Sequence, residues 1–424
     1  AALFVPPALA VGGRLIFWPR MGAAEPASAA EPRAETPEGA APGSDVPRRR
    51  LTVRLAVRHP VISSVLVLVV VGAAASGLGR IAIGNSLVRD LPPSSQVLRA
   101  YNQAGRGFSL GVLSPGELLV TGPNVVAQRS ALVRLQPLIA TQPGMAQVFG
   151  PRQVPLERRL GFAVAPSGNA VRYVFFLRAD PLGAAGIEAV ENLRHRLPEL
   201  VHRAGLSHVT ATVAGDTALS ADVVRGTIDS LRRVIPAVLL AVFLVVALFL
   251  RALVAPFYLV LTSLLGVAAS LGLTVWVLQV ALGYGQIAYY VVFTVGVMLI
   301  SLGSDYNVFL VGRIWQEGRK RRFKEAIEIA GSQAARSITT AGFVLAMSFA
   351  LLAIVPLRPF REIAFGMAVG LLIDAFVVRT ILVPALLALV GPRSAWPGRA
   401  LRRTQPATTE EPPGPAGEVG LVQG

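Results

Sequence analysis

The sequence IAYYVVFTVGVMLISLGSDYNVFLVGR, residues 287–313, is an apolar stretch interrupted by a polar cluster that includes Ser301, Asp305, Tyr306 and Asn307. About 20 apolar residues cross the hydrocarbon core of a bilayer, so the stretch predicts a membrane-spanning helix with Asp305 inside the membrane. A carboxylate at that depth normally faces a bundle interior, where it holds helices together or belongs to an ion or proton path. Ser301 lies one helical turn before Asp305, and Tyr306 adds a hydroxyl.

A second acid, Asp374, lies in another apolar stretch, residues 362–390. Gly366, Gly370 and Asp374 recur every four residues and therefore share one helix face. The two glycines let a neighbouring helix approach closely, which serves assembly alone or also brings polar groups to Asp374.

Arg379 follows Asp374 by five residues and is deep enough to need a partner in the membrane. Asp374, Asp305 or a backbone carbonyl fits that role. Together with Arg313, which lies near the end of the stretch 287–313, Arg379 and the two acids predict a set of acids and bases at the centre of the bundle.

Composition indicates a polytopic membrane protein, because 53% of the 424 residues are hydrophobic. The net charge of +16 is explained by arginines beside apolar spans, and no basic stripe interleaved with aromatic residues indicates nucleic-acid binding. The sequence contains no Cys and no Gly-Lys pair, so it lacks thiol chemistry and the phosphate-binding loop of ATPases. The four histidines have neither metal-ligand spacing nor a place beside a nucleophile.

The beginning of the chain resembles its end. Alignment of residues 1–20 with 379–398 matches Val5 with Val383, Pro6 with Pro384, Leu9 with Leu387, Gly13 with Gly391, Trp18 with Trp396 and Pro19 with Pro397. Transporters commonly contain internal repeats, so we expect 1–20 to be the end of the last helix of a missing first half; coincidence between two helix ends is the alternative.

Residues 21–50 are rich in Ala, Pro, Glu and Gly, and with the basic run that follows they predict a disordered cytoplasmic linker over 21–58. Arginines at its end precede a transmembrane helix over 59–79, so the positive-inside rule puts residue 80 on the outer side. Residues 80–233 are polar enough for an extracytoplasmic α/β domain. Its periodicity predicts strands and helices in the order β-α-β-β-α-β, a ferredoxin-like module.

Residues 234–391 predict a five-helix transmembrane bundle, and 392–424 a disordered cytoplasmic tail. The loop 313–336 is basic and falls on the inner side, with its KEAIEIA segment as a short amphipathic helix on the membrane surface. Arg358 and Arg361 fall in a short outer loop, against the positive-inside rule.

Three segments carry a resemblance to a family: GSDYNVFLVGR (303–313), GLLIDAFVVRTILVP (370–384) and NSLVRDLPPSS (85–95). They resemble the MmpL ("mycobacterial membrane protein large") transporters of the resistance-nodulation-division (RND) superfamily. The resemblance covers nearly the whole chain as the second half of such a transporter. It implies an RND-type transmembrane bundle with an extracytoplasmic porter domain, in the inner (plasma) membrane.

The resemblance implies that the Asp305–Tyr306 pair couples proton flow to lipid export, with support from Asp374, Arg379, Arg313 and Ser301. The family uses two Asp-Tyr pairs, whereas this sequence contains one. The expected function is therefore proton-motive-force-driven export of lipids or other hydrophobic molecules by a protein that is not an enzyme and needs no cofactor. Its expected partners are membrane lipids as cargo and the missing N-terminal half, with an oligomer and accessory envelope proteins left open and no nucleic acid. A drug efflux pump of the same superfamily, a membrane scaffold or lipid sensor, and a nonfunctional fragment are the alternatives.

Overall fold

The computed structural model describes residues 46–152 and 163–398, except for the side chains of residues 46–51, 304 and 305. Within these ranges six helical segments are long and apolar enough to cross a membrane: Pro60–Arg80, Asp216–Leu250, Val254–Ala281, Tyr289–Gly318, Phe323–Ile354 and Arg358–Ala395. The chain is therefore a polytopic membrane protein. The predicted helix end 1–20, residues 21–45 of the linker and the tail beyond 398 lie outside the described residues.

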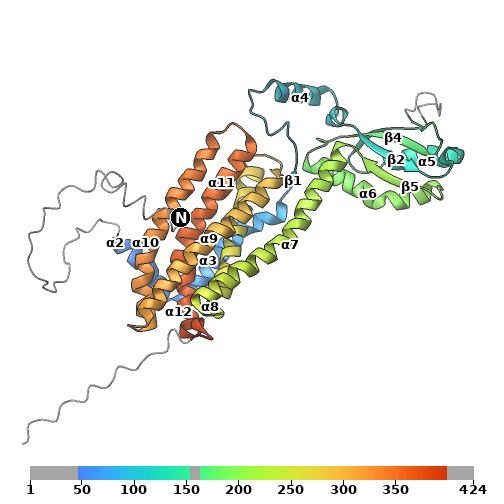
Figure 1. Cartoon of the computed structure of the whole chain (residues 1–424). Coiled ribbons are helices and arrows are strands. Elements are labelled where there is room, and N and C mark those ends of the chain that lie inside the picture. Colours follow the sequence, from blue (N-terminus) through green and yellow to red (C-terminus); the bar gives the residue numbers. More distant parts are fainter. Residues whose placement is uncertain (1–45, 153–162, 399–424) are drawn as a thin grey trace, which may run out of the picture. The chain divides into compact units, whose positions relative to one another are not determined.

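The bundle is built from long helices (Figure 1). They bury small and branched side chains against one another. They are α3 (Pro60–Ala75), α7 (Asp216–Leu250), α8 (Val254–Thr274), α9 (Tyr289–Gly318), α10 (Phe323–Ala350), α11 (Arg358–Leu372) and α12 (Val383–Val390). Two π-helical segments extend α8 and α11: η5 (Val275–Ala281) and η7 (Ile373–Leu382).

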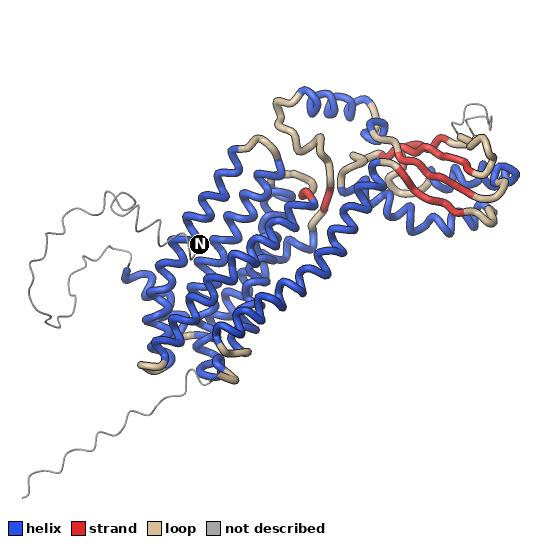
Figure 2. The backbone as a smooth tube through the Cα atoms, in the orientation of Figure 1, coloured by secondary structure: helices blue, strands red, loops and turns tan. Residues whose placement is uncertain are grey.

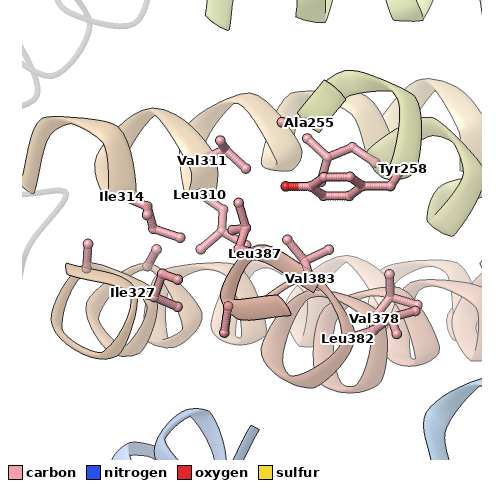
Figure 3. Packing of buried hydrophobic residues seen from close by; sticks show 14 of the residues in the cluster. Ala255, Tyr258, Leu310, Val311, Ile314, Ile327, Val378, Leu382, Val383 and Leu387 are labelled. Carbon is pink, nitrogen blue, oxygen red and sulfur yellow. The ribbon is translucent and has the colours of Figure 1, made fainter. Parts of the chain in front are cut away.

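One apolar cluster joins most of these elements (Figure 3). Leu310 and Val311 of α9, Ile327 of α10, Val378 of η7 and Leu387 of α12 are all buried in it. Helices that bury apolar side chains on several faces in this way are typical of a membrane bundle.

Glycines permit a close helix crossing between the end of α3 and α8. A Cβ atom added to Gly272 of α8 would lie 2.7 Å from the Cα atom of Ala75. One added to Gly77, in the 3₁₀ turn η1 (Ser76–Arg80), would lie 2.8 Å from the carbonyl carbon of Gly272. Small residues on both sides therefore let these two backbones touch.

Residues between α3 and α7 form a four-stranded antiparallel sheet with two helices, drawn with red strands in Figure 2. Its elements in chain order are β2 (Gly116–Thr121), α5 (Arg129–Ala140), β3 (Met145–Phe149), β4 (Ala170–Leu177), α6 (Ala184–Ala204) and β5 (Thr210–Ala214), and the strands lie in the order β3-β4-β2-β5. Alternate residues of β4 are buried, and they share one core with α5 and α6. The alternate side chains of β4 and the side chains on one face of α6 therefore pack together in a single apolar layer.

Two connections link this sheet to the bundle. Helix α7 starts directly after β5 and runs unbroken through the predicted boundary at residue 233. The short strands β1 (Ile83–Gly84) and β6 (Ile287–Ala288) pair in parallel, so the chain leaving α3 lies beside the start of α9. A further helix, α4 (Gln96–Gly107), precedes the sheet and is capped by Ser95.

The linker prediction is wrong for its last part, because Val46–Arg58 forms helix α2. Val53, Ala56 and Val57 are buried, and the Cγ1 atom of Val53 lies 3.4 Å from the Cβ position of Gly331 in α10. These residues have the i, i+3, i+4 spacing of a helix face, which the surrounding arginines conceal in the sequence.

Two further boundaries differ from the prediction. The KEAIEIA segment is the first part of α10 and not a separate surface helix, since Ala326, Ile327 and Ala330 are buried in the bundle. The predicted disordered tail is wrong for residues 392–398. A 3₁₀ turn, η8 (Gly391–Ala395), is followed by Trp396, whose carbonyl accepts a hydrogen bond of 2.8 Å from the Leu253 N–H.

Candidate functional site

Arg379 is the largest fully buried side chain among the described residues, with 1% of its surface exposed. Its Nε donates to Oδ2 of Asp374 at 2.7 Å, and its Nη2 lies 2.6 Å from the same oxygen. In an α-helix two residues five apart point about 140° away from each other. The π-helical geometry of η7, with its i→i+5 hydrogen bonds, brings both side chains to one side.

The remaining guanidinium donors of Arg379 bind α9. Nη1 donates to Oδ1 of Asn307 at 3.3 Å, and Nη2 donates to the carbonyl oxygen of Gly303. The Tyr306 ring centroid lies 5.1 Å from the Arg379 guanidinium carbon, within the range of a cation–π contact. These bonds give a buried cation the partners that it needs in place of water.

Asn307 extends this cluster to a third helix. Its amide donates to Oγ of Ser263, in α8, at 3.1 Å. The side chains of Ser263, Tyr306, Asn307, Asp374 and Arg379 therefore connect α8, α9 and η7 at one point, and we call them the acid–base cluster. A change in the charge of the cluster would act on three helices together.

The glycine face of α11 lies directly before the cluster. A Cβ atom on Gly366 would lie 3.2 Å from Cγ2 of Val295 in α9, and one on Gly370 would lie 2.8 Å from Oγ of Ser270 in α8. Ser270 also donates to the Gly366 carbonyl at 2.6 Å. The close approach predicted at the two glycines is confirmed, and it brings a hydroxyl of α8 onto this face.

The other predicted site residues separate into two groups. The backbone of Asp305 belongs to α9 beside Tyr306, while its side chain lies outside the described residues. Ser301 and Arg313 are exposed, and the Arg313 guanidinium lies 5.5 Å from the ring centroid of Phe309. Arg313 does not join the described acid–base groups: it lies six positions after Asn307, about 9 Å along the helix axis.

Sequence reasoning missed Glu362, which is 2% exposed and accepts a hydrogen bond of 3.1 Å from the Ala288 N–H. Glu362 precedes Gly366 by four residues, so it continues the face that leads to Asp374. That spacing was the available signal. Ser263 and Ser270 gave no comparable signal, since lone serines in an apolar helix are common.

Tyr306 also lines an open groove of about 650 Å³ between α9 and α10. Arg336, Thr340 and Ser348 of α10 supply its polar groups, and Ala341 and Val344 supply apolar wall. One face of Tyr306 thus meets the buried Arg379, and the residue is also reachable from this groove. In the part of the chain that the structure describes, no group of three or more His, Cys, Asp or Glu residues is arranged to hold a metal ion.

The fold and the acid–base cluster define a polytopic membrane protein with a buried ion pair inside its helix bundle. The sequence model of the MMPL family matches residues 94–409, and the chain belongs to this family. A putative membrane protein of Streptomyces coelicolor is 30% identical over 99% of this chain and 48% of its own length.

Two other relatives are named as transport proteins. The apo-petrobactin exporter of Bacillus anthracis is 26% identical over 82% of this chain and 45% of its own length. The probable transport protein MmpL9 of Mycobacterium tuberculosis is 31% identical over 55% of this chain and 24% of its own length. The chain spans about half the length, or less, of these relatives.

Proposed function

We propose that this chain forms one half of an RND-type transporter that uses the proton motive force to export lipids or other hydrophobic molecules across the inner (plasma) membrane. The observation that carries the proposal is the buried Asp374–Arg379 pair. Arg379 binds Gly303 and Asn307 of α9, which lie two residues before and two residues after Asp305. Buried ionisable groups in a membrane bundle are expensive, and their usual purpose is an ion or proton path.

In the proposed cycle Asp305 is the group that takes up and releases the proton. A carboxylate beside a cation holds its charge, whereas a carboxylate in an apolar setting favours its protonated form. Movement of α9 against η7 changes the distance between Asp305 and Arg379, so proton binding and helix packing depend on each other. Tyr306 and Asn307 hold the guanidinium in position during this exchange.

We assign the sheet and its two helices to an extracytoplasmic porter domain of ferredoxin-like topology. The β-α-β-β-α-β order and the strand order β3-β4-β2-β5 support this assignment. Helix α7 continues from the sheet into the bundle, so repacking of α7 against α9 would move the domain. Within the domain, Asp180 binds the segment that follows β1, since it accepts from Ser86 Oγ at 2.6 Å and pairs with Arg89 at 2.9 Å.

The proposed partners are the other half of the same transporter and membrane lipids as cargo, with an oligomer or accessory envelope proteins as further candidates. The protein would catalyse no covalent reaction and would need no cofactor besides the proton gradient. Export of small molecules is the second candidate, and it is favoured by the relative that is named for exporting apo-petrobactin.

The test uses proteoliposomes that contain the transporter with both halves. A pH gradient is imposed, and export of a fluorescent lipid or of a small hydrophobic dye is followed with and without a proton ionophore. Gradient-dependent lipid movement that the ionophore abolishes supports the proposal, and dye movement alone favours the second candidate. If neither cargo responds to the gradient, a scaffold or lipid sensor replaces the transporter.

A further inference from the structure

A second polar site lies at the end of the bundle where α9 and α11 begin. It is a cavity of about 500 Å³, and its lining includes Arg89, Leu91, Leu98, Tyr284, Arg358 and Arg361. Three guanidinium groups and no carboxylate line it. Its apolar wall includes Leu91 before α4 and Leu98 within it.

Only one of the three arginines forms an ion pair in the described part of the chain. Arg89 pairs with Asp180 at 2.9 Å. Arg358 donates from Nη2 to the carbonyl oxygen of Tyr284 at 2.6 Å and lies 4.0 Å from the centroid of that ring. Arg361 is exposed, and no carboxylate of the described residues bonds to it. Among the described residues neither Arg358 nor Arg361 forms an ion pair, although Asp90 interacts with Arg358 electrostatically.

The backbone of α11 also contributes positive electrostatic potential at the cavity. Helix α11 begins at Arg358 without a side-chain cap at Leu357, so the positive end of its dipole lies at the cavity. Arg358 and Arg361 also follow a turn at which Leu351 and Ile354 are exposed. The positive-inside rule does not account for basic residues in an outer loop. Binding of an anion would account for Arg358 and Arg361.

We propose that this cavity binds a phosphate group, carried either by a lipid headgroup or by a free phosphate anion. Arginine binds phosphate through planar, charge-assisted hydrogen bonds, and the several oxygens of one phosphate can accept from more than one guanidinium. Arg361 supplies the unpaired charge, and Arg358 is held for binding by Tyr284. The exposed Leu351, Ile354 and Phe360 offer apolar surface for an acyl chain.

The phosphate site is independent of proton coupling, because none of its lining residues belongs to the acid–base cluster. Binding can be measured without transport. Failure of one proposal therefore leaves the other standing.

The test is a calorimetric titration of the purified protein in detergent. The probes are dihexanoyl phosphatidylglycerol, inorganic phosphate and dihexanoylglycerol, which lacks the phosphate. Arg361→Gln is compared with Arg99→Gln, a matched exposed arginine on α4 that does not line the cavity. We expect Arg361→Gln to raise the Kd for the phosphate probe at least about tenfold, as the loss of a charge-assisted bond predicts, and Arg99→Gln to leave it unchanged.

The probes distinguish the two sources of phosphate. Binding of phosphatidylglycerol alone, with loss in Arg361→Gln, identifies a lipid headgroup site. Binding of inorganic phosphate with the same dependence on Arg361 identifies a site for free phosphate. Equal affinity of the wild type and Arg361→Gln, or equally tight binding of dihexanoylglycerol, overturns the proposal.

Discussion

The Nε atom of Arg379 lies 2.7 Å from Oδ2 of Asp374, five residues earlier in the same π-helical segment. π-Helical turns are rare and frequently occur at functional sites. Here the turn has a direct structural consequence, because it lets an acid and a base of one helix form a pair that also binds Gly303 and Asn307 of α9.

Removal of the cation should destabilise the bundle. Arg379→Met leaves Asp374 buried without its partner, and we expect the free energy of unfolding to fall by about 3–5 kcal/mol. Thermal or denaturant unfolding in detergent measures the change. The matched control is Arg313→Met, an exposed arginine on α9, with an expected cost below about 1 kcal/mol. Equal costs for the two variants would show that burial of the pair contributes nothing.

Gly370 should be intolerant of a methyl group. Its Cβ atom would lie 2.8 Å from Ser270 Oγ and would also clash with Leu299, so Gly370→Ala should cost about 1–3 kcal/mol of stability. Gly296→Ala on α9 is the control, because its added Cβ atom meets nothing within 4 Å. That variant should be neutral or slightly stabilising, since alanine has the higher helix propensity. The same unfolding assay compares them.

Two neutral members of the cluster, Asn307 and Ser263, should differ in importance. Asn307→Leu removes the acceptor of Arg379 and leaves a buried charged donor unsatisfied, at a cost of about 1–3 kcal/mol. Ser263→Ala removes one neutral hydrogen bond, at a cost of about 0.5–1.5 kcal/mol. Unfolding of both variants and of the double variant measures the difference and the coupling. A larger loss for Ser263→Ala would contradict the central place given to Arg379.

Phosphate binding should strengthen as the pH falls. Burial raises the pKa of Asp90 to about 6, with Arg358 lowering it and Asp180 raising it. Glu362 of α11 and Tyr290 of α9 also interact with Asp90 electrostatically. Below pH 6 Asp90 is protonated and no longer offsets the charge of Arg358, so the anion should bind more tightly.

Titration of the protein with dihexanoyl phosphatidylglycerol from pH 8 to pH 5 measures this effect, because a phosphodiester keeps one charge over that range. Asp90→Asn should bind more tightly than the wild type at pH 8 and should lose the part of the pH dependence that Asp90 supplies. An unchanged pH profile in Asp90→Asn would show that another group is responsible.

Much of the fold could be predicted because hydrophobic periodicity is strong in its helices and strands. The strands and helices between residues 116 and 214 follow the predicted order β-α-β-β-α-β. Apolar length alone located the six spans. Helix α2 was missed, because a short apolar face among arginines looks like a charged linker.

The acid–base cluster was predicted only in part. Asp374 and Arg379 stood out because charged residues are rare in apolar spans. Their π-helical geometry was not predictable, since i→i+5 bonding has no clear sequence pattern. Arg313 and Arg379 are the same residue type. Which of them is buried depends on its position along the helix and on the side of the helix that it occupies. Both depend on packing between helices that are distant in sequence.

Proton-driven export by wild type, Asp305→Asn and Asp229→Asn at matched protein levels tests the central claim most directly. Asp229 is the control because it is an acid of α7 that pairs with Arg232 outside the acid–base cluster. The transporter is reconstituted with both halves, and lipid export and proton uptake are followed together under an imposed pH gradient. We expect Asp305→Asn to fold normally and to lose both activities, while Asp229→Asn retains them. Undiminished, gradient-dependent export by Asp305→Asn would contradict the central claim.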